Sequence, residues 1–543
     1  MVGGKLIRIS LIFGILSLFI GTSVIPGLSV VKGDHTSPLM SSMNYTSILD
    51  ANYIYNISKA LSDIIFTEYN ESAGELAKGR FFGTKGEHKA AEILYENMTK
   101  LGLYTKKEQI KNIEKKLYPK LSKLTHKIEI LEYGLKINNE TIVDFHIVPS
   151  KNGPRCDPGN LNYNFSYTGL KVYKKPRFLL PWRIKNLFRE KEDFVLIEQS
   201  RSFNPGLQPL WMKILSKFID PMRKPMMFGP KFLKHNPDKE RLYHFFPHCK
   251  GIINYDFNMN TYNQGASGTS IPIIYINGTI GKKIMEDLKH ASVDFYINQS
   301  YNDSVISYNV IGQLNGTNPN ITVIVDCLYD SWWCQGTADA AIGMAMVLGI
   351  AKYFVENNLK PKYNLKFIGF CGEEIGIRGA KYYEATHPDE DIIYVIDLNQ
   401  ICFWQDGPRL TLNVIFNKLS FLREIWKVVE KTDYKEITKD TADIKPLWIP
   451  TGAPSDDQVF VFRPRCKTVC FLKDTGWLLH HRDGEGHNEG DVMKYFDWDD
   501  VNATGEIILN VTKYLVIEKN HEEDQVNNIP SQFLHERIVK KID

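Results

Sequence analysis

The sequence lacks the short motifs that identify several common enzyme classes. It contains no HExxH zinc motif, no GxSxG nucleophile elbow, no GxxxxGK[ST] phosphate loop and no GxGxxG dinucleotide loop. It also has no CxxC metal knuckle and no internal repeat. These absences argue against HExxH metalloproteases, α/β-hydrolases, P-loop enzymes and dinucleotide-binding oxidoreductases.

The chain has little net charge and few long hydrophobic runs. The formal charge is +3 over 543 residues, which gives no reason to expect a nucleic-acid partner. Hydrophobic residues make up 43% and charged residues 24%, as in ordinary globular proteins. The length is sufficient for two or three domains with substantial cores.

The one long hydrophobic run lies at the N-terminus. Lys5 and Arg8 precede the apolar stretch 9–21, and small and turn-forming residues follow it. This order is typical of a secretory signal peptide, although weak apolar character up to Val31 also permits a signal anchor. Residues 1–31 are therefore predicted to be a signal peptide or signal anchor, and any membrane contact would be made through this segment.

Glycosylation sequons are dense behind this segment, and there are eight cysteines. The sequons, behind a signal segment, favour a secreted or cell-surface glycoprotein, and an even number of cysteines permits disulfides in such a protein. Pairing of Cys156 with Cys249 and of Cys466 with Cys470 is a guess from the sequence. The sequons are at Asn44, Asn56, Asn70, Asn97, Asn139, Asn164, Asn277, Asn298, Asn302, Asn315, Asn320, Asn502 and Asn510.

The N-terminal part is predicted to be helical, most clearly over 84–103. Thr84 and Glu87 form a capping-box pair, apolar residues recur on one helix face, and Gly102 provides a stop. The lysine-rich stretch 105–127 is interpreted as a solvated helix face. Strand-like alternation follows at 127–133 and 141–148.

The middle of the chain, about 150–306, is predicted to be a separate β-rich module. It contains short strands at 194–198, 251–255 and 271–276, with a short helix from Gly281. The basic and aromatic segment 211–241 within it is interpreted as an irregular insertion, with a membrane-surface or lid role as the alternative.

From Tyr308 onward strands and helices alternate, which predicts a largely parallel sheet covered on both faces. The predicted strands are 321–326, 365–370, 392–398, 410–416 and 467–472, and the predicted helices are 341–356, 419–431 and 501–516.

Acidic residues gather at the ends of these predicted strands. Asp330 follows one strand, Asp339 precedes a helix, and Glu373 and Glu374 follow the next strand. Carboxylates at this edge of an α/β sheet are costly unless they bind a cation or perform acid–base chemistry. With a histidine they form a ligand set suited to Zn²⁺.

These motifs resemble the M28 family of zinc aminopeptidases. The resemblance covers 309–516 and the helix at 84–103, and it rests on GTADAAIG and CGEEIG. The strands in GIINYDFN and SIPIIYI resemble a protease-associated (PA) domain. The resemblance implies an α/β fold with a mostly parallel mixed sheet flanked by helices, and an inserted β-rich PA-like domain that would restrict access to the site.

The predicted divisions follow from this resemblance. They are an N-terminal helical segment packing on the catalytic domain (45–149), a PA-like inserted domain (150–307), an M28-like catalytic domain (308–519) and a polar C-terminal tail (520–543).

The resemblance also implies the role of each acid. Asp339 matches the aspartate that bridges two zinc ions, Glu374 matches a zinc ligand, and Glu373 matches the general base. In the family a histidine is followed by an aspartate four residues on and another six further. His487, Asp491 and Asp497 reproduce this spacing, so His487 is the predicted ligand.

Two family ligands are replaced, and both belong to the same metal. Leu328 stands at the histidine of the family's HxD strand, and Asn399 stands at the aspartate of its NLD-type strand. Asp339, Glu374 and His487 are retained for the other metal, which implies one Zn²⁺ per chain, as in the related glutaminyl cyclases. Asp397 lies on the same strand face as Asn399 and is the alternative donor.

Several other residues have less certain roles. The family Ser-Asp-His reads Ser455-Asp456-Asp457 here, a change without a derived meaning. Asp330 is a candidate to orient neighbouring ligands. Candidate substrate contacts are His480, His481 and Trp332, for which plain surface or core packing is an equal alternative.

Three functions remain open at this level. The first is a zinc exopeptidase of the aminopeptidase type, acting on peptides or proteins with Glu373 as general base. The second is a glutaminyl-cyclase-like acyltransferase on a one-zinc site, and the third is a catalytically silent binding protein of the same fold. Metal content per chain separates them, because a conventional peptidase holds two ions, a single-zinc enzyme one, and a silent protein none.

Overall fold

The computed structural model describes a β-rich part and an α/β part that carries the candidate site. The described residues are 48–65, 79–113, 124–125, 127–142, 145–148, 163–174, 194–198, 251–255, 273–302, 304–331, 334–402, 410–432, 442–453, 455–473 and 491–519.

The main sheet has eight strands in the order β1-β10-β12-β11-β13-β16-β14-β15. The central run from β12 to β16 is parallel, while β1 and β10 on one side and β14 next to β16 are antiparallel. The strands are β1 (Tyr104–Gln109), β10 (Tyr308–Leu314), β11 (Asn318–Leu328), β12 (Tyr363–Phe370), β13 (Asp391–Leu398), β14 (Leu410–Phe416), β15 (Ala442–Trp448) and β16 (Lys467–Lys473).

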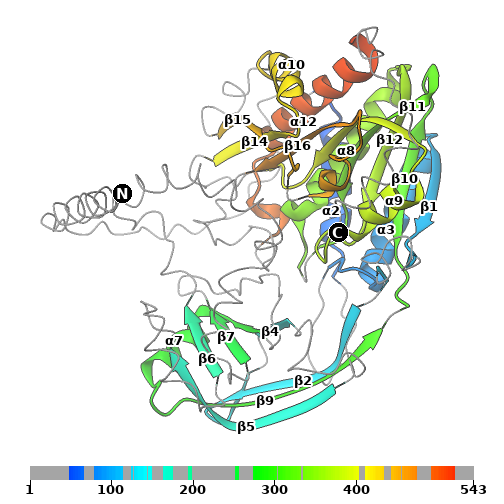
Figure 1. Ribbon diagram of the computed structural model, residues 1–543. Helices are drawn as coiled ribbons and strands as arrows, with labels where there is room; N and C mark the ends of the chain where they lie inside the picture. Colours follow the sequence, from blue (N-terminus) through cyan, green and yellow to red (C-terminus); the bar gives the residue numbers. More distant parts are fainter. Residues whose placement is uncertain are drawn as a thin grey trace, which may run out of the picture. The chain divides into compact units, whose positions relative to one another are not determined.

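Helices cover both faces of this sheet, so the predicted fold class is confirmed (Figure 1). Helix α8 (Ile342–Glu356) is almost wholly buried and packs against one face together with α2 (Ala51–Ser62). Helices α3 (Lys85–Lys100), α10 (Leu419–Val429) and α12 (Trp498–Lys513) extend the same layer. The other face carries α9 (Arg378–Thr386) and the short helix η5 (Asp456–Val459).

Helix α3 forms where the capping pattern predicted it. The Thr84 side chain accepts a hydrogen bond from the Glu87 N–H at 3.2 Å. The Glu87 carboxylate reaches back to the Gly83 N–H at 3.3 Å, one residue earlier than an ideal capping box. Ala90, Leu94 and Met98 are fully buried, which confirms the predicted apolar face.

The lysine-rich stretch after α3 differs from its prediction. Residues 104–109 form edge strand β1, paired with β10, and not a helix face. Lys107 lies over the rings of Tyr95 and Tyr308. Side chains alternate between the two faces of a strand, so the lysines of an edge strand can face solvent as the lysines of an exposed helix face do. Lysines are also typical of sheet edges.

A second sheet has the order β3-β2-β9-β5-β6-β7-β8-β4. Its strands β2 to β4 precede residue 149, so the expected N-terminal helical segment contributes strands to this sheet. The elements are β2 (Lys127–Ile137), β3 (Glu140–Ile142), β4 (Phe145–Val148), β5 (Tyr163–Lys174), β6 (Phe194–Glu198), β7 (Gly251–Tyr255), β8 (Ile273–Ile276), α7 (Gly278–Glu286) and β9 (Ser292–Asn302).

Two further expectations change on structural grounds. Cys466 and Cys470 are both free and buried, so the guessed disulfide between them is wrong; Cys156 and Cys249 lie outside the described residues. Asn502 is 1% exposed in α12, so its sequon is inaccessible in the folded chain. Strand β15 and helix α9 had no sequence prediction.

The Thr84 cap gives a test of the α3 start. Replacement Thr84→Ala removes the side-chain acceptor for the Glu87 N–H and should lower stability by about 1 kcal/mol. Thermal unfolding monitored by circular dichroism measures the change. The matched control is Thr99→Ala in the same helix, where an exposed hydroxyl bonds the Tyr95 carbonyl and the stability should change by less than about 0.5 kcal/mol. Equal effects of the two substitutions would contradict the capping role.

Candidate metal and acid–base site

The acids at the strand ends come together because β11 and β12 are parallel neighbours. Leu328 and Phe370 are register partners at the ends of the two strands, so the residues that follow leave the sheet at the same edge. The Glu373 N–H donates to Asp330 Oδ1 at 3.3 Å. Asp330 is fully buried, while Glu373 and Glu374 are half-buried.

The turn that presents Glu373 and Glu374 is fixed by its backbone. Gly372 has φ +79°, and a Cβ there would lie 2.8 Å from the Phe82 ring. The Glu373 carbonyl accepts from the N–H groups of Gly376 and Ile377 at 2.9 and 3.0 Å. Only glycine satisfies both the conformation and the close approach, so the preceding glycine is part of what aims the two acids.

Asp339 is held by a different part of the chain. It lies in the turn Thr337–Ala341 before α8, where the Ala338 N–H donates to Asp491 Oδ1 at 2.7 Å. The Asp339 N–H donates to Asp491 Oδ2 at 3.3 Å. Asp491 thus positions the Asp339 backbone. Burial raises the pKa of Asp491 to about 7, although the hydrogen bond from the Ala338 N–H lowers that pKa.

One carboxylate oxygen of Asp339 already has a protein partner. Gln400 Nε2 donates to Asp339 Oδ2 at 2.8 Å. Gln400 follows Asn399, whose Oδ1 accepts from the Gln400 N–H at 2.8 Å and whose Nδ2 donates to Ser455 Oγ at 3.0 Å. The end of β13 therefore places an amide hydrogen bond against Asp339.

Arg80 joins the segments that carry these acids. Its guanidinium is fully buried and donates to the carbonyls of Tyr329 at 2.8 Å and Gly336 at 2.9 Å, and also to Gln335. It reaches α2 through the Leu61 carbonyl at 3.0 Å. Burial lowers the pKa of Arg80, and the nearby acids oppose that shift.

The site is dominated by negative charge. Burial raises the pKa of Glu373 well above its usual value, and Glu374 raises it further, followed by Asp456 and Asp339. Burial likewise raises the pKa of Asp330, with Glu374 as the main electrostatic contribution. Acids packed this closely bind a divalent cation readily, since the ion relieves their mutual repulsion.

The structure brings together most of the acids predicted from the sequence, but several predicted residues cannot be located. Glu373 lies within electrostatic reach of Asp330, Asp339 and Glu374, and Asp330 lies within electrostatic reach of Glu374. His487, His480, His481 and Trp332 lie outside the described residues.

The departures from the family pattern lie side by side. Asp326 and Asp397 are register partners in β11 and β13, so Leu328 and Asn399, two residues on, occupy neighbouring strand ends. Leu328 is fully buried and apolar, and Asn399 makes the protein hydrogen bonds described above. Asp397 is fully buried and bonded to the Asp457 N–H at 3.3 Å, deeper in the sheet than the acids at its edge.

Sequence reasoning missed two residues of this site. Gln400 follows the replaced ligand directly, and its position beside Asn399 was the available signal. Arg80 had no such signal, because it lies 249 residues from the Tyr329 carbonyl that it binds.

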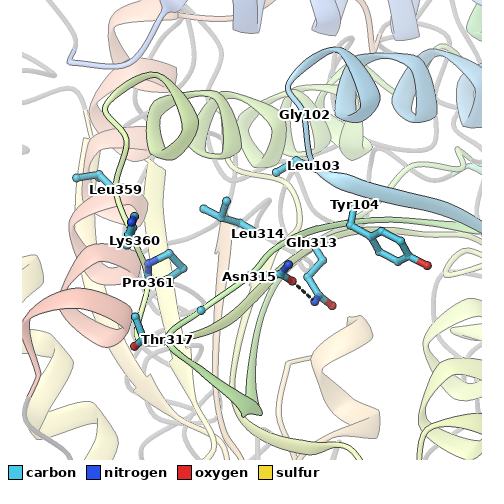
Figure 2. A pocket seen from close by; sticks show the side chains of 11 residues that line it. Gly102, Leu103, Tyr104, Gln313, Leu314, Asn315, Thr317, Leu359, Lys360 and Pro361 are labelled. Atoms are coloured by element: carbon cyan, nitrogen blue, oxygen red, sulfur yellow. Dashed lines mark hydrogen bonds between the residues drawn. The ribbon is translucent and has the colours of Figure 1, made fainter.

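A pocket of about 670 Å³ lies at the opposite end of the strands (Figure 2). It is lined by the start of β1, the end of β10 and the loop before β12, including Tyr104, Leu314 and Pro361. Because β12 begins at Tyr363 and Glu373 follows its end, this pocket lies away from the acids.

Residues 309–512 match the model of peptidase family M28. The fold is similar to that of a zinc aminopeptidase from Bacillus subtilis, with TM-score 0.55 and 16% identity over 88% of this chain and 100% of that one. It is also similar to a peptidase M28 precursor from Shewanella amazonensis, with TM-score 0.57 and 14% identity over 88% and 95% of the two chains. No curated protein matches by sequence.

The role of Arg80 can be tested without an activity assay. Replacement Arg80→Lys keeps the charge but cannot reproduce four guanidinium hydrogen bonds, so we expect stability to fall by about 3 kcal/mol. Urea unfolding followed by tryptophan fluorescence measures the change. Arg465→Lys, which alters an exposed pair with Asp391, is the control and should have little effect. A stable Arg80→Lys protein would show that Arg80 does not hold these segments together.

Proposed function

We propose that this chain is a zinc-dependent exopeptidase of the aminopeptidase type. The observation that carries the proposal is the convergence of Asp339, Glu373 and Glu374 from two separate segments onto one edge of the main sheet. The M28 match over 309–512 supports a peptidase, and the solved structures support the fold.

The donor set fits zinc. Two carboxylates and one imidazole form a ligand set that zinc accepts. Asp339 and Glu374 lie near each other, because both help to raise the pKa of the buried Cys334 thiol, which is not itself a proposed ligand. His487 is the proposed third ligand. It precedes Asp491 by four residues, a length of chain that spans at most about 14 Å, and Asp491 is bonded beside Asp339.

Each residue has a defined part in the reaction. A zinc ion held by Asp339, Glu374 and His487 would supply a Lewis acid for the scissile carbonyl and for a water molecule. Glu373 accepts the proton of the attacking water and returns it to the leaving amine. Asp330 holds the Glu373 backbone through its N–H, and Asp491 holds the backbone of Asp339. His480, His481 and Trp332 are the proposed substrate contacts.

We further propose that this centre holds one zinc ion. A bridging aspartate offers one oxygen to each of two metals, whereas Asp339 Oδ2 here accepts the Gln400 amide. The neighbouring positions are Leu328, which has no donor, and Asn399, which bonds Ser455 and Gln400. Three protein ligands and one open position suffice for a catalytic zinc site.

The single-metal arrangement favours one second candidate function. Cyclisation of an N-terminal glutaminyl residue also needs one Lewis acid and a proton-transferring carboxylate. The same Glu373 and the same zinc ligands would serve this intramolecular aminoacyl transfer, in which the α-amine attacks the side-chain amide and ammonia leaves.

The remaining features are consistent with work on extracellular peptides. The N-terminal segment and the sequons support export and glycosylation, and the PA-like insert would limit access to peptide or protein substrates. Polar tail 520–543 has no proposed role.

The acid–base role is tested by Glu373→Gln. We expect a fall in kcat of about 10²–10⁴-fold with bound zinc unchanged, because the amide cannot accept the water proton. Release of amino acids from aminoacyl amides and formation of pyroglutamate from glutaminyl peptides are measured side by side on the full chain. Glu374→Gln should lose both activity and the active-site zinc.

The outcomes separate the three functions. Amide release identifies the peptidase, pyroglutamate formation identifies the acyltransferase, and absence of both activities together with absence of active-site zinc identifies the silent binding protein. Glu384→Gln is the control for a half-buried acid outside the site, bonded to Arg463, and should leave kcat unchanged.

A further inference from the structure

A second group of acids lies inside the main sheet, away from its edge. Asp326 in β11, Asp397 in β13 and Cys470 in β16 are register partners across three neighbouring parallel strands. Side chains at paired positions of parallel strands point to the same face. The three therefore form a row on the face that η5 covers.

Helix η5 adds a fourth donor to this row. The Asp457 N–H donates to Asp397 Oδ2 at 3.3 Å, while the Asp457 carboxylate accepts from Ala453 N–H at 3.0 Å and Thr468 Oγ1 at 2.8 Å. Ligand atoms of Asp397, Asp457 and Cys470 lie within 4.8 Å of one another. All three residues are fully buried.

Asp326 is the observation that points to a missing partner. Its side chain is 0% exposed, and neither carboxylate oxygen has a hydrogen-bond partner among the described residues. A buried carboxylate without partners is strongly destabilising. Burial raises the pKa of Asp326 well above its usual value. The negative charges of Asp397, Asp456 and Asp457 raise the pKa further, so its electrostatic neighbours are other acids.

We propose that Asp326, Asp397, Asp457 and Cys470 form an internal binding site for a divalent cation of the zinc class, distinct from the active-site metal. Three carboxylates and one thiol come from β11, β13, η5 and β16, so one ion would tie four elements together. It would neutralise charge that otherwise opposes folding of the sheet beneath the active site.

The donor chemistry selects this class of ion. Thiolate ligands favour zinc over Ca²⁺ or Mg²⁺, which prefer oxygen alone. A tetrahedral zinc with bonds of about 2.0–2.3 Å holds its ligand atoms about 3.3–3.8 Å apart. Among Asp397, Asp457 and Cys470 the separations of up to 4.8 Å need only a small contraction of side chains. The Asp326 carboxylate, on the same face of neighbouring strand β11, would move toward these three donors to complete the site. Four protein donors leave no open position, as in structural rather than catalytic zinc sites.

The alternative is that protons alone neutralise the acids. Protons act on each carboxyl separately, whereas one cation would bond all four donors at once. The thiol distinguishes this site from the active site, whose proposed ligands Asp339, Glu374 and His487 contain no sulfur.

Cobalt substitution tests the proposal on the full-length chain. The purified protein is stripped with a chelator and titrated with Co²⁺, and absorbance reports a thiolate-to-cobalt charge-transfer band in the near ultraviolet. We expect this band to saturate at one Co²⁺ per chain. It should be lost in Cys470→Ser and retained in Cys466→Ser, a matched change of a buried free cysteine just outside β16.

The experiment also separates this site from the proposed catalytic one. Glu374→Gln should retain the band although it loses the active-site metal, whereas Asp326→Asn should weaken zinc binding at the internal site by at least about tenfold. Total zinc content alone does not distinguish two catalytic ions from one catalytic and one internal ion. Loss of activity with the band intact would contradict only the proposed function.

Two results would overturn the internal site. One is a wild-type protein without the thiolate band, and the other is a band that survives in Cys470→Ser. If the variants fail to fold, a crystal of the zinc-loaded wild-type chain decides the question. An anomalous difference peak at the zinc edge between Asp397, Asp457 and Cys470 supports the site, and an empty position there refutes it.

Discussion

The geometry of the candidate active site depends on one buried guanidinium. Arg80 bonds the carbonyls of Tyr329, Gln335 and Gly336, which flank Asp330 and precede Asp339. Its burial is tolerable because every one of these bonds is made to a fixed backbone acceptor. The same positive charge lies near Asp330, Asp339 and Asp491, so one side chain both shapes the loop and offsets part of its negative charge.

The negative charge that Arg80 does not offset gives this edge of the sheet the character of a cation-binding site. Parallel strands that end together place their following residues at one edge, and here those residues are acids. A second row of acids lies deeper in the sheet, at Asp326, four residues before Asp330, and at its register partner Asp397 in β13. Leu328 and Asn399, the two positions expected from the sequence to lack a metal ligand, lie two residues beyond Asp326 and Asp397 on the same strands.

Much of the α/β part was predictable from local patterns. Alternation of apolar runs with helical periods located β11, β12, β13, β14 and β16, and the GEE turn indicated where acids leave the sheet. Edge strand β1 was mistaken for a helix because its residues, YTKKEQ, contain no alternation of apolar and polar side chains that would indicate a strand. Arg80 and Gln400 act through contacts far along the chain, which no local pattern encodes. The depth of Asp397 was likewise invisible, because period-two alternation gives the face of a strand but not the distance from its end.

The Gln400 hydrogen bond has a consequence for how the active site is tuned. An amide donor on Asp339 Oδ2 draws electron density from the carboxylate and fixes its plane. A second cation at Oδ2 would do the same, but it would also add positive charge near Glu373. In the proposed one-zinc centre the amide would add no positive charge beside Glu373, so Glu373 would keep a higher pKa and remain a stronger base for the attacking water. In that proposed centre the Gln400 amide would thus hold the orientation of Asp339 in place of a second metal, and proton abstraction would depend on Glu373.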